Sequence, residues 1–84
     1  MAQLDDVTNA VIAQLTADGV PADDPTKVLG ADLHYTEPTM DNFLEAVKIR
    51  LQPAYTFTYL PAFIAEALTL TIAELIGRID DQTN

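Results

Sequence analysis

Residues 36–51 read TEPTMDNFLEAVKIRL, a segment with the periodicity of an α-helix. Its apolar side chains recur at the three- and four-residue spacing of one helix face, at Met40, Phe43, Leu44, Val47 and Leu51. We expect the helix to begin near Thr36, because Pro38 then lies in the first turn, where its missing N–H group costs nothing. Pro53 ends the helix.

A second helix is predicted before this segment. One stripe of the helical period is formed by Leu4, Val7, Val11, Ile12 and Leu15. Asp5 and Asp6 fall in the first turn, where the helix dipole favours negative charge. Gly19 is a suitable C-terminal cap, and Pro21 prevents continuation.

The C-terminal part of the chain is also helical in pattern. Apolar residues keep helical phase through residues 61–79, which permits one long helix or two shorter ones. We favour a break near Thr71, because Glu74 three residues later completes a capping-box pattern and Leu70 lies off the apolar stripe.

Two connections separate these helices. Residues 20–35 form a long loop that Val28, Leu29 and Leu33 anchor. Residues 54–60 alternate threonine with aromatic side chains, but a lone strand has no partner, so we expect an extended connection held by its aromatic groups. The sequence therefore predicts an all-α fold, a small bundle of three or four helices, with residues 1–84 as a single domain.

Charge limits the partners of this domain. The chain has 84 residues, with 13 acidic against 4 basic side chains and a net charge of −9. Nucleic acids and anionic membrane surfaces repel such a chain, so we expect neither as a partner and favour a protein with a basic surface. The longest apolar stretch, residues 59–76, contains Glu66 and Glu74, which argues against a membrane span. The N-terminal residues show no secretory signal, so we expect a cytoplasmic protein.

Catalytic and metal-binding chemistry have little support in the sequence. The chain has no cysteine and no serine, which excludes cysteine and serine nucleophiles and a thiolate zinc site. His34, the only histidine, lies near Asp32, Glu37 and Asp41, but no other soft ligand is present and the spacing is not that of an EF-hand calcium loop. A solvated or hydrogen-bonded loop histidine is the simpler interpretation. We expect no enzyme activity, no metal and no cofactor.

Exposed apolar groups are also expected. Ile49, Leu60 and Leu70 lie off the apolar stripes, which favours an interaction surface. The aromatic side chains of residues 55–63 either anchor a loop to the core or form an apolar groove.

Four short motifs then point to a family. Residues 28–32, VLGAD, are similar to a Leu-Gly-Ala-Asp sequence that precedes an Asp-Ser-Leu attachment motif, and residues 39–42, TMDN, to the Ser-Leu-Asp-Thr that starts a second helix. Residues 59–61 and 70–79 are similar to the Glu-Ile-Pro and the last helix of the same family. The chain thus resembles the acyl carrier proteins over its whole length. The resemblance implies a first helix, a long loop, a second helix, a short third helix and a closing fourth.

The chain departs from this family at its attachment residue. Family members carry 4′-phosphopantetheine on the motif serine, whereas this chain has ten threonines and no serine. Leu33 or Thr39 falls at the attachment position, depending on which motif is aligned, and we favour Thr39 because Pro38 marks the start of a helix. The methyl group of threonine crowds the hydroxyl, so we expect no pantetheine arm.

The expected function is that of a non-catalytic, acyl-carrier-protein-like module that acts through protein–protein contacts in fatty acid, polyketide or related biosynthesis. The residues expected to bind the partner are Leu33, His34, Thr39, Met40 and Asp41. The second helix, with Asp41, Glu45, Lys48 and Arg50, has no net charge, unlike the acidic second helix of the family. Alternatives are a working carrier modified at Thr39, an acidic inhibitor or docking protein that binds a basic partner, and a homodimer formed through residues 57–79.

Overall fold

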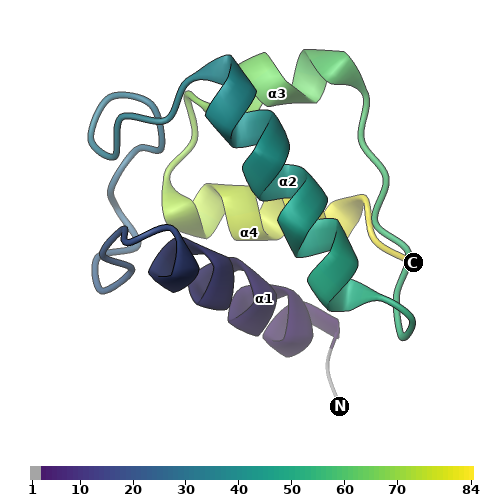
Figure 1. The fold of residues 1–84 in the computed structure, drawn as a ribbon. Helices are drawn as coiled ribbons and strands as arrows, with labels where there is room; N and C mark the ends of the chain where they lie inside the picture. The colour runs from purple at the N-terminus through teal and green to yellow at the C-terminus, as the bar shows by residue number, and fades with distance from the viewer. Residues whose placement is uncertain (1–2) are drawn as a thin grey trace.

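Residues 3–84, the part of the chain that the computed structural model describes, contain four α-helices joined by loops (Figure 1). They are α1 (Gln3–Ala17), α2 (Glu37–Leu51), α3 (Pro61–Ala67) and α4 (Ile72–Asp81). The predicted all-α fold, a small helical bundle, is confirmed. Residues 1 and 2 of the predicted domain lie outside the described range.

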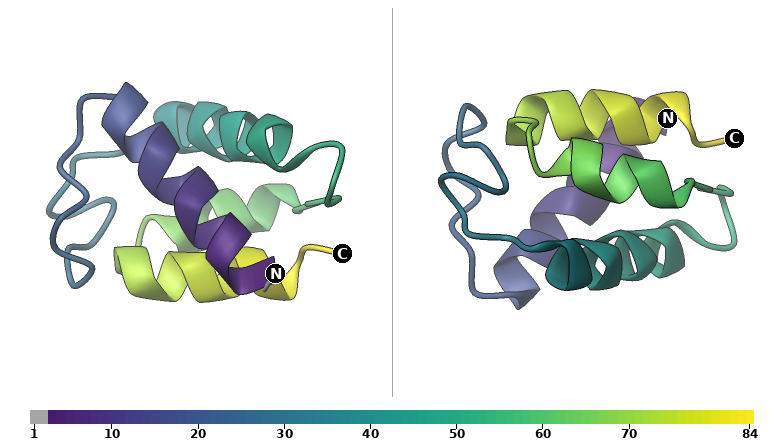
Figure 2. Two further views of the ribbon diagram at one scale, coloured as in Figure 1. Left: turned by 90° about the horizontal axis from the view of Figure 1, so that it is seen from below. Right: turned by 90° about the horizontal axis from the view of Figure 1, so that it is seen from above.

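The helices surround one apolar core. Helix α1 crosses α2 and α4 and packs against both, while α3 packs against α2 (Figure 2). The prediction for the buried face of α1 needs a correction, because Leu4 is 48% and Ile12 38% exposed, whereas Ala10 is buried. Helix α1 buries Val7, Ala10, Val11 and Leu15, so only part of the predicted apolar stripe is covered. The core contains Val7, Ala10, Val11, Leu15, Leu29, Tyr35, Met40, Phe43, Leu44, Val47, Leu51, Phe57, Phe63, Ala67, Ile72, Leu75 and Ile79.

The end of α1 follows the predicted capping. Gly19 has a φ of +76°, the left-handed conformation that glycine adopts without a steric penalty. The N–H group of Val20 donates to the carbonyl of Leu15, and that of Gly19 to the carbonyl of Thr16. These two bonds form a Schellman motif, so the chain leaves the helix where the sequence predicts.

The break in the C-terminal helical region is also confirmed. Helix α3 ends at Ala67 and α4 begins at Ile72, with Thr71 as its N-cap. The Thr71 hydroxyl accepts from the Glu74 N–H group, and the Glu74 carboxylate accepts from the Thr71 N–H group, which is the predicted capping box. Leu70, expected to be exposed, instead packs partly buried against the core.

The long loop is tied to the α3–α4 junction through the VLGAD segment. Leu29 is fully buried, and its N–H group donates to the Leu70 carbonyl over 3.0 Å. Gly30 donates to the Leu68 carbonyl over 2.9 Å, an approach so close that a Cβ atom on Gly30 would lie 2.7 Å from the same oxygen. A glycine is therefore required here for close backbone contact.

The 54–60 connection has a partner that the sequence pattern did not reveal. Thr56 and Asn84 exchange N–H to carbonyl bonds of 2.8 and 2.9 Å, and Phe57 forms an isolated antiparallel bridge with Thr83. The expectation that this segment is unpaired is therefore wrong, because its partner is the distant C-terminus. Phe57 is fully buried and Phe63 nearly so, so these aromatic rings serve as core anchors.

Two further predictions concern surface properties. Helix α2 begins at Glu37, so three acidic and two basic side chains lie on it, and its net charge is −1 rather than the predicted zero. Among residues 3–84, no helix is long and apolar enough to cross a membrane.

Candidate functional site

Two threonines, Thr36 and Thr39, cap the N-terminus of α2. Thr36 is the N-cap, with an extended φ of −113° and ψ of 173°. The Thr39 hydroxyl accepts from the Thr36 N–H group over 2.8 Å, and the Thr36 hydroxyl accepts from the Thr39 N–H group over 3.5 Å. Thr39 is exposed, but its hydroxyl is part of the cap. The residue at the favoured attachment position therefore has a structural role.

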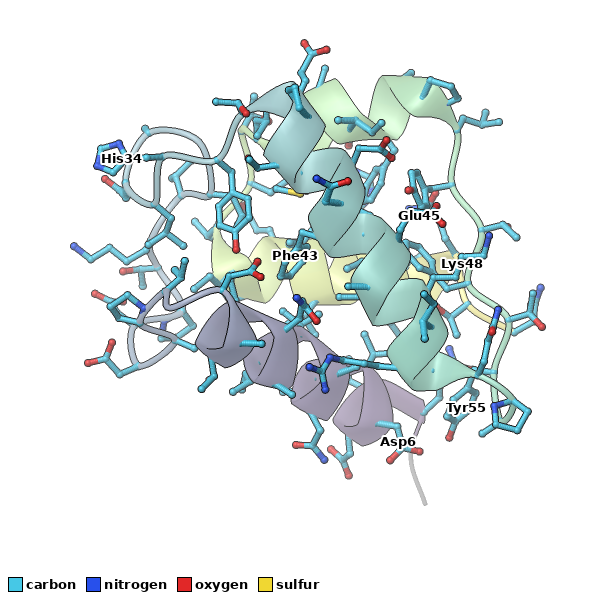
Figure 3. All side chains as sticks on the ribbon, viewed as in Figure 1. Asp6, His34, Phe43, Glu45, Lys48 and Tyr55 are labelled. Carbon is cyan, nitrogen blue, oxygen red and sulfur yellow. The ribbon has the colours of Figure 1, made fainter. Side chains whose placement is uncertain are left out.

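His34 precedes this helix in an uncommon backbone conformation. Its φ of +64° is left-handed, which histidine tolerates better than most residues. Its N–H group donates to the Gly30 carbonyl over 3.1 Å, so His34 closes the turn that begins at Gly30. The side chain is exposed and projects from the loop away from the helices (Figure 3). This turn directs the chain from the buried Leu29 toward the start of α2.

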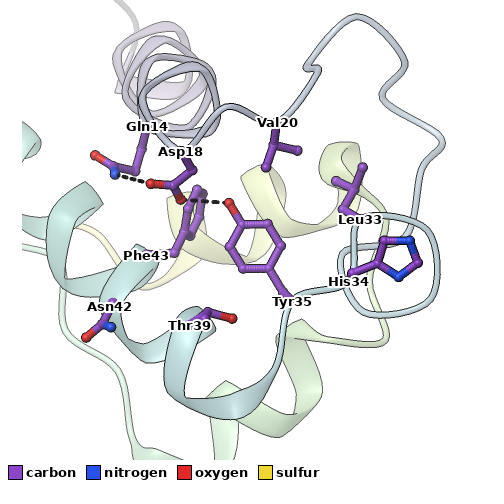
Figure 4. A pocket seen from close by; sticks show the side chains of 9 residues that line it. All are labelled: Gln14, Asp18, Val20, Leu33, His34, Tyr35, Thr39, Asn42 and Phe43. Carbon is purple, nitrogen blue, oxygen red and sulfur yellow. Dashed lines mark hydrogen bonds between the residues drawn. The ribbon is translucent and has the colours of Figure 1, made fainter.

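A pocket of about 400 Å³ lies between this loop, the end of α1 and the first half of α2 (Figure 4). Its apolar walls are Val20, Leu33 and the rings of Tyr35 and Phe43. The two rings meet edge to face, with centroids 5.5 Å apart and an interplanar angle of 75°. The polar groups that line it are Gln14, Asp18, His34, Thr39 and Asn42. Its volume lies in the range of small-ligand sites, roughly 300–1,000 Å³.

A hydrogen-bonded chain of side chains fixes one wall of the pocket. The Tyr35 hydroxyl donates to Asp18 Oδ2 over 2.7 Å, and Gln14 Nε2 donates to Asp18 Oδ1 over 2.9 Å. Gln14 Oε1 in turn accepts from Arg50 Nε over 2.9 Å. Burial and the bond to Asp18 raise the pKa of Tyr35 above its ordinary value, so the hydroxyl keeps its proton and remains a donor. The Asp18 carboxylate is therefore held in one orientation.

The structure separates the five residues predicted to bind a partner. Leu33, His34 and Thr39 line the pocket. Met40 does not belong to this surface, because it is fully buried: it follows the exposed first turn on the face of α2 that meets the core. The prediction of Met40 as a surface contact is therefore corrected. Asp41 is exposed, but it is not among the residues that line the pocket.

Asp41 takes part in a different cluster. The Tyr59 hydroxyl donates to Asp41 Oδ1 over 2.9 Å and lies 2.6 Å from Glu45 Oε2. Burial of the ring, together with the Glu45 and Asp41 carboxylates, raises the pKa of Tyr59 above its ordinary value. Tyr59 stacks on Phe57, with ring centroids 5.3 Å apart. This cluster fastens the 54–60 connection to α2.

Sequence reasoning missed the residues that shape the pocket. Gln14 and Asp18 lie four residues apart, a spacing that places them on one side of a helical turn, which was the only local signal. Tyr35 gave no periodic signal because it lies in the loop. Its contact with Asp18 depends on the course of the 16 residues between them, which no local pattern specifies.

The pocket has the chemistry of a binding site. Its lining residues carry a carboxylate, two amides, two hydroxyls, an imidazole and apolar groups. Within residues 3–84, no group of three or more histidine, cysteine, aspartate or glutamate side chains is arranged to hold a metal ion. Comparisons of the chain with protein-family models, with curated proteins and with solved structures gave no match.

Proposed function

We propose that this chain is a non-catalytic, acyl-carrier-protein-like module of the cytoplasm that binds a biosynthetic enzyme through the surface at the start of α2. The observation that carries the proposal is the pocket, which gathers Leu33, His34 and Thr39 between the loop and α2. Thr39 and Asn42 extend this surface onto the exposed side of the helix. The partner belongs to fatty acid, polyketide or related biosynthesis.

The order of the helices supports this proposal. A long first helix, a 19-residue connection from 18 to 36, a second helix, a short third helix and a closing fourth follow each other in the order that the resemblance to acyl carrier proteins implies. The VLGAD segment also has a structural role, because Leu29 is buried in the core and Gly30 allows close backbone contact with Leu68.

The absence of a pantetheine arm is supported by the chemistry of the α2 cap. The Thr39 hydroxyl contacts the Thr36 hydroxyl and the Thr36 carbonyl, each over 3.2 Å, in addition to the bond it accepts from the Thr36 N–H group. Attachment at Thr39 would disturb this cap, at a cost of about 1 kcal/mol. A module without an arm acts through its surface alone.

Modification is tested by mass. The chain is incubated with coenzyme A and a promiscuous phosphopantetheinyl transferase, with a carrier protein of known activity as positive control. We expect the intact mass to stay unchanged. An added pantetheine arm that disappears in Thr39→Ala would overturn the unmodified state and favour the working carrier instead.

Partner binding is tested by titration of the ¹⁵N-labelled chain with ketosynthases and adenylating enzymes from the source organism. We expect amide shifts to concentrate at Leu33, His34 and Thr39. Asn42→Arg places a cation beside the pocket and weakens binding to a basic surface, whereas Asn9→Arg, an exposed position of α1, serves as the matched control. Equal weakening by both variants, or shifts centred elsewhere, would contradict the proposed surface.

A further inference from the structure

The pocket at the start of α2 is negatively charged in its polar part. Asp18 is the acidic residue among those that line it. None of the lysines and arginines of residues 3–84 lines the pocket. The nearest base defined by a hydrogen bond is Arg50, which reaches Asp18 only through Gln14. A cationic group is therefore favoured over an anionic one.

Asp18 has free capacity to accept hydrogen bonds. Each of its oxygens receives one donor, Tyr35 on Oδ2 and Gln14 on Oδ1. A carboxylate has about four lone-pair positions, so two remain for a ligand. Because Asp18 is already oriented, a ligand with two parallel N–H donors can bind it with little further loss of side-chain entropy.

The walls of the pocket suit a cation on an apolar stem. Val20 and Leu33 offer contact to methylene groups, as occurs when long basic side chains lie along apolar surface. The ring of Tyr35 lies next to the carboxylate, because its hydroxyl bonds to Asp18. A planar guanidinium forms paired bonds with a carboxylate, whereas the ammonium of lysine is a point charge. The Tyr35 ring is only 8% exposed, so it borders the site rather than offering an open face.

We propose that this pocket receives an arginine side chain of the protein partner, with the guanidinium on Asp18 and the aliphatic stem between Val20, Leu33 and Tyr35. The inference rests on the proposed function and names the chemistry by which the partner is recognised. The net charge of −9 attracts a basic surface, and the pocket selects one side chain of that surface. Arginine is among the residues most enriched at interfaces, which suits such an anchor.

The test uses the free side chain and needs no partner. The ¹⁵N-labelled chain is titrated with N-acetyl-arginine amide and, separately, with N-acetyl-citrulline amide, which has nearly the same shape but no charge. We expect saturable shifts at Val20, Leu33 and Tyr35 with the arginine probe, and affinity at least about ten-fold lower with citrulline, as for the loss of a charged hydrogen bond.

Two isosteric variants locate the binding. Asp18→Asn lowers the affinity for the arginine probe about ten-fold, whereas Asp23→Asn, which removes the same charge from an exposed loop position outside the pocket, leaves it within about two-fold. Equal affinity for citrulline and arginine, or equal effects of the two variants, would overturn the inference. Because no partner enzyme is present, this failure is distinct from failure of the proposed partner binding.

Discussion

Helices α2 and α4 both begin with a threonine N-cap and a capping box, but the two caps differ in their hydrogen bonds. Each has a threonine N-cap, Thr36 or Thr71, that exchanges hydrogen bonds with the third residue of its helix. In α4 that residue is Glu74, and both bonds are short, at 3.0 and 3.1 Å. In α2 it is Thr39, and the bond to the N-cap hydroxyl is 3.5 Å. The N-cap hydroxyl therefore makes the shorter bond in α4, whereas in α2 the shorter bond is the one of 2.8 Å from the Thr36 N–H group to the Thr39 hydroxyl.

The surroundings of the two helix starts differ more than the caps. The long loop covers the start of α4, where the N–H groups of Ile72 and Ala73 donate to the carbonyls of Lys27 and Pro25 over 3.0 and 3.1 Å. The start of α2 borders the pocket instead, with Thr39 in its wall. The first turn of α4 is thus part of the framework, whereas the first turn of α2 is left accessible.

The largest effect is expected where the loop is fastened near α4. Leu29→Ala removes a fully buried side chain and lowers the free energy of unfolding by about 2–5 kcal/mol. Leu60→Ala, at a side chain 75% exposed, changes it by less than about 0.5 kcal/mol. The free energies of unfolding of both variants are measured by chemical denaturation and compared with that of the parent chain. Equal effects would show that the loop does not anchor the framework.

A second variant tests the close approach of loop and α3–α4 junction without removing apolar surface. Gly30→Ala brings Cβ to 2.7 Å from the Leu68 carbonyl, so backbone must move, at a cost of about 1–3 kcal/mol. Gly77→Ala, within α4 and with no atom within 4 Å of the added Cβ apart from the local backbone of its own helix, stabilises the chain by about 0.5–1 kcal/mol. If Gly30→Ala leaves the stability unchanged or raises it, as is expected for Gly77→Ala, the contact at Gly30 does not require glycine.

The two caps are compared directly by Thr71→Ala and Thr36→Ala. We expect Thr71→Ala to cost about 1 kcal/mol and Thr36→Ala about 0.5 kcal/mol, because the Thr36 hydroxyl makes the longer bond. Thermal unfolding gives the stabilities, and amide hydrogen exchange shows which helix start opens. If Thr36→Ala lowers the free energy of unfolding more than Thr71→Ala does, the cap of α2 contributes more to stability than the cap of α4, contrary to this expectation.

The sequence predicted the two helix starts because their signals are local. Thr36 with Pro38, and Thr71 with Glu74, lie within four residues of each other, and helix capping depends on such short distances. The pairing of Phe57 with Thr83 was missed because it joins segments that are distant in the sequence.

Prediction of the site is limited for the same reason, because its residues come from segments that are distant in the sequence. Leu33, His34 and Thr39 were found because they surround the second-helix start, but Asp18 comes from beyond the end of α1. Leu4 and Ile12 fit the helical period as well as the buried residues do, and only the positions of α2 and α4 determine which apolar side chains are covered. The local spacing of residues therefore predicts the helices. The pocket depends on how the long loop packs against α1 and α2, which local spacing does not specify.

The smallest effect, and the one most specific to the α2 side, concerns the hydroxyl of Tyr35. Tyr35→Phe keeps the buried ring and loses the bond to Asp18, which costs about 0.5 kcal/mol near neutral pH. In the unfolded chain the tyrosine loses its proton near pH 10, whereas burial raises its pKa in the folded chain. Above about pH 10 the unfolded state therefore binds fewer protons than the folded state, and stability falls as pH rises.

This pH dependence is expected of Tyr35 and also of Tyr59, so each tyrosine is tested by its own variant. Denaturation of Tyr35→Phe from neutral pH to beyond pH 10 is expected to show a shallower alkaline loss than the parent chain, with phenolate absorbance reporting titration. Tyr59→Phe is the matched variant, since its hydroxyl bonds to Asp41 and Glu45 outside the pocket and its pKa is also raised. If Tyr35→Phe keeps the full alkaline loss, the pocket wall is not held by a protonated Tyr35 on Asp18, and the preformed orientation of that carboxylate has to be abandoned.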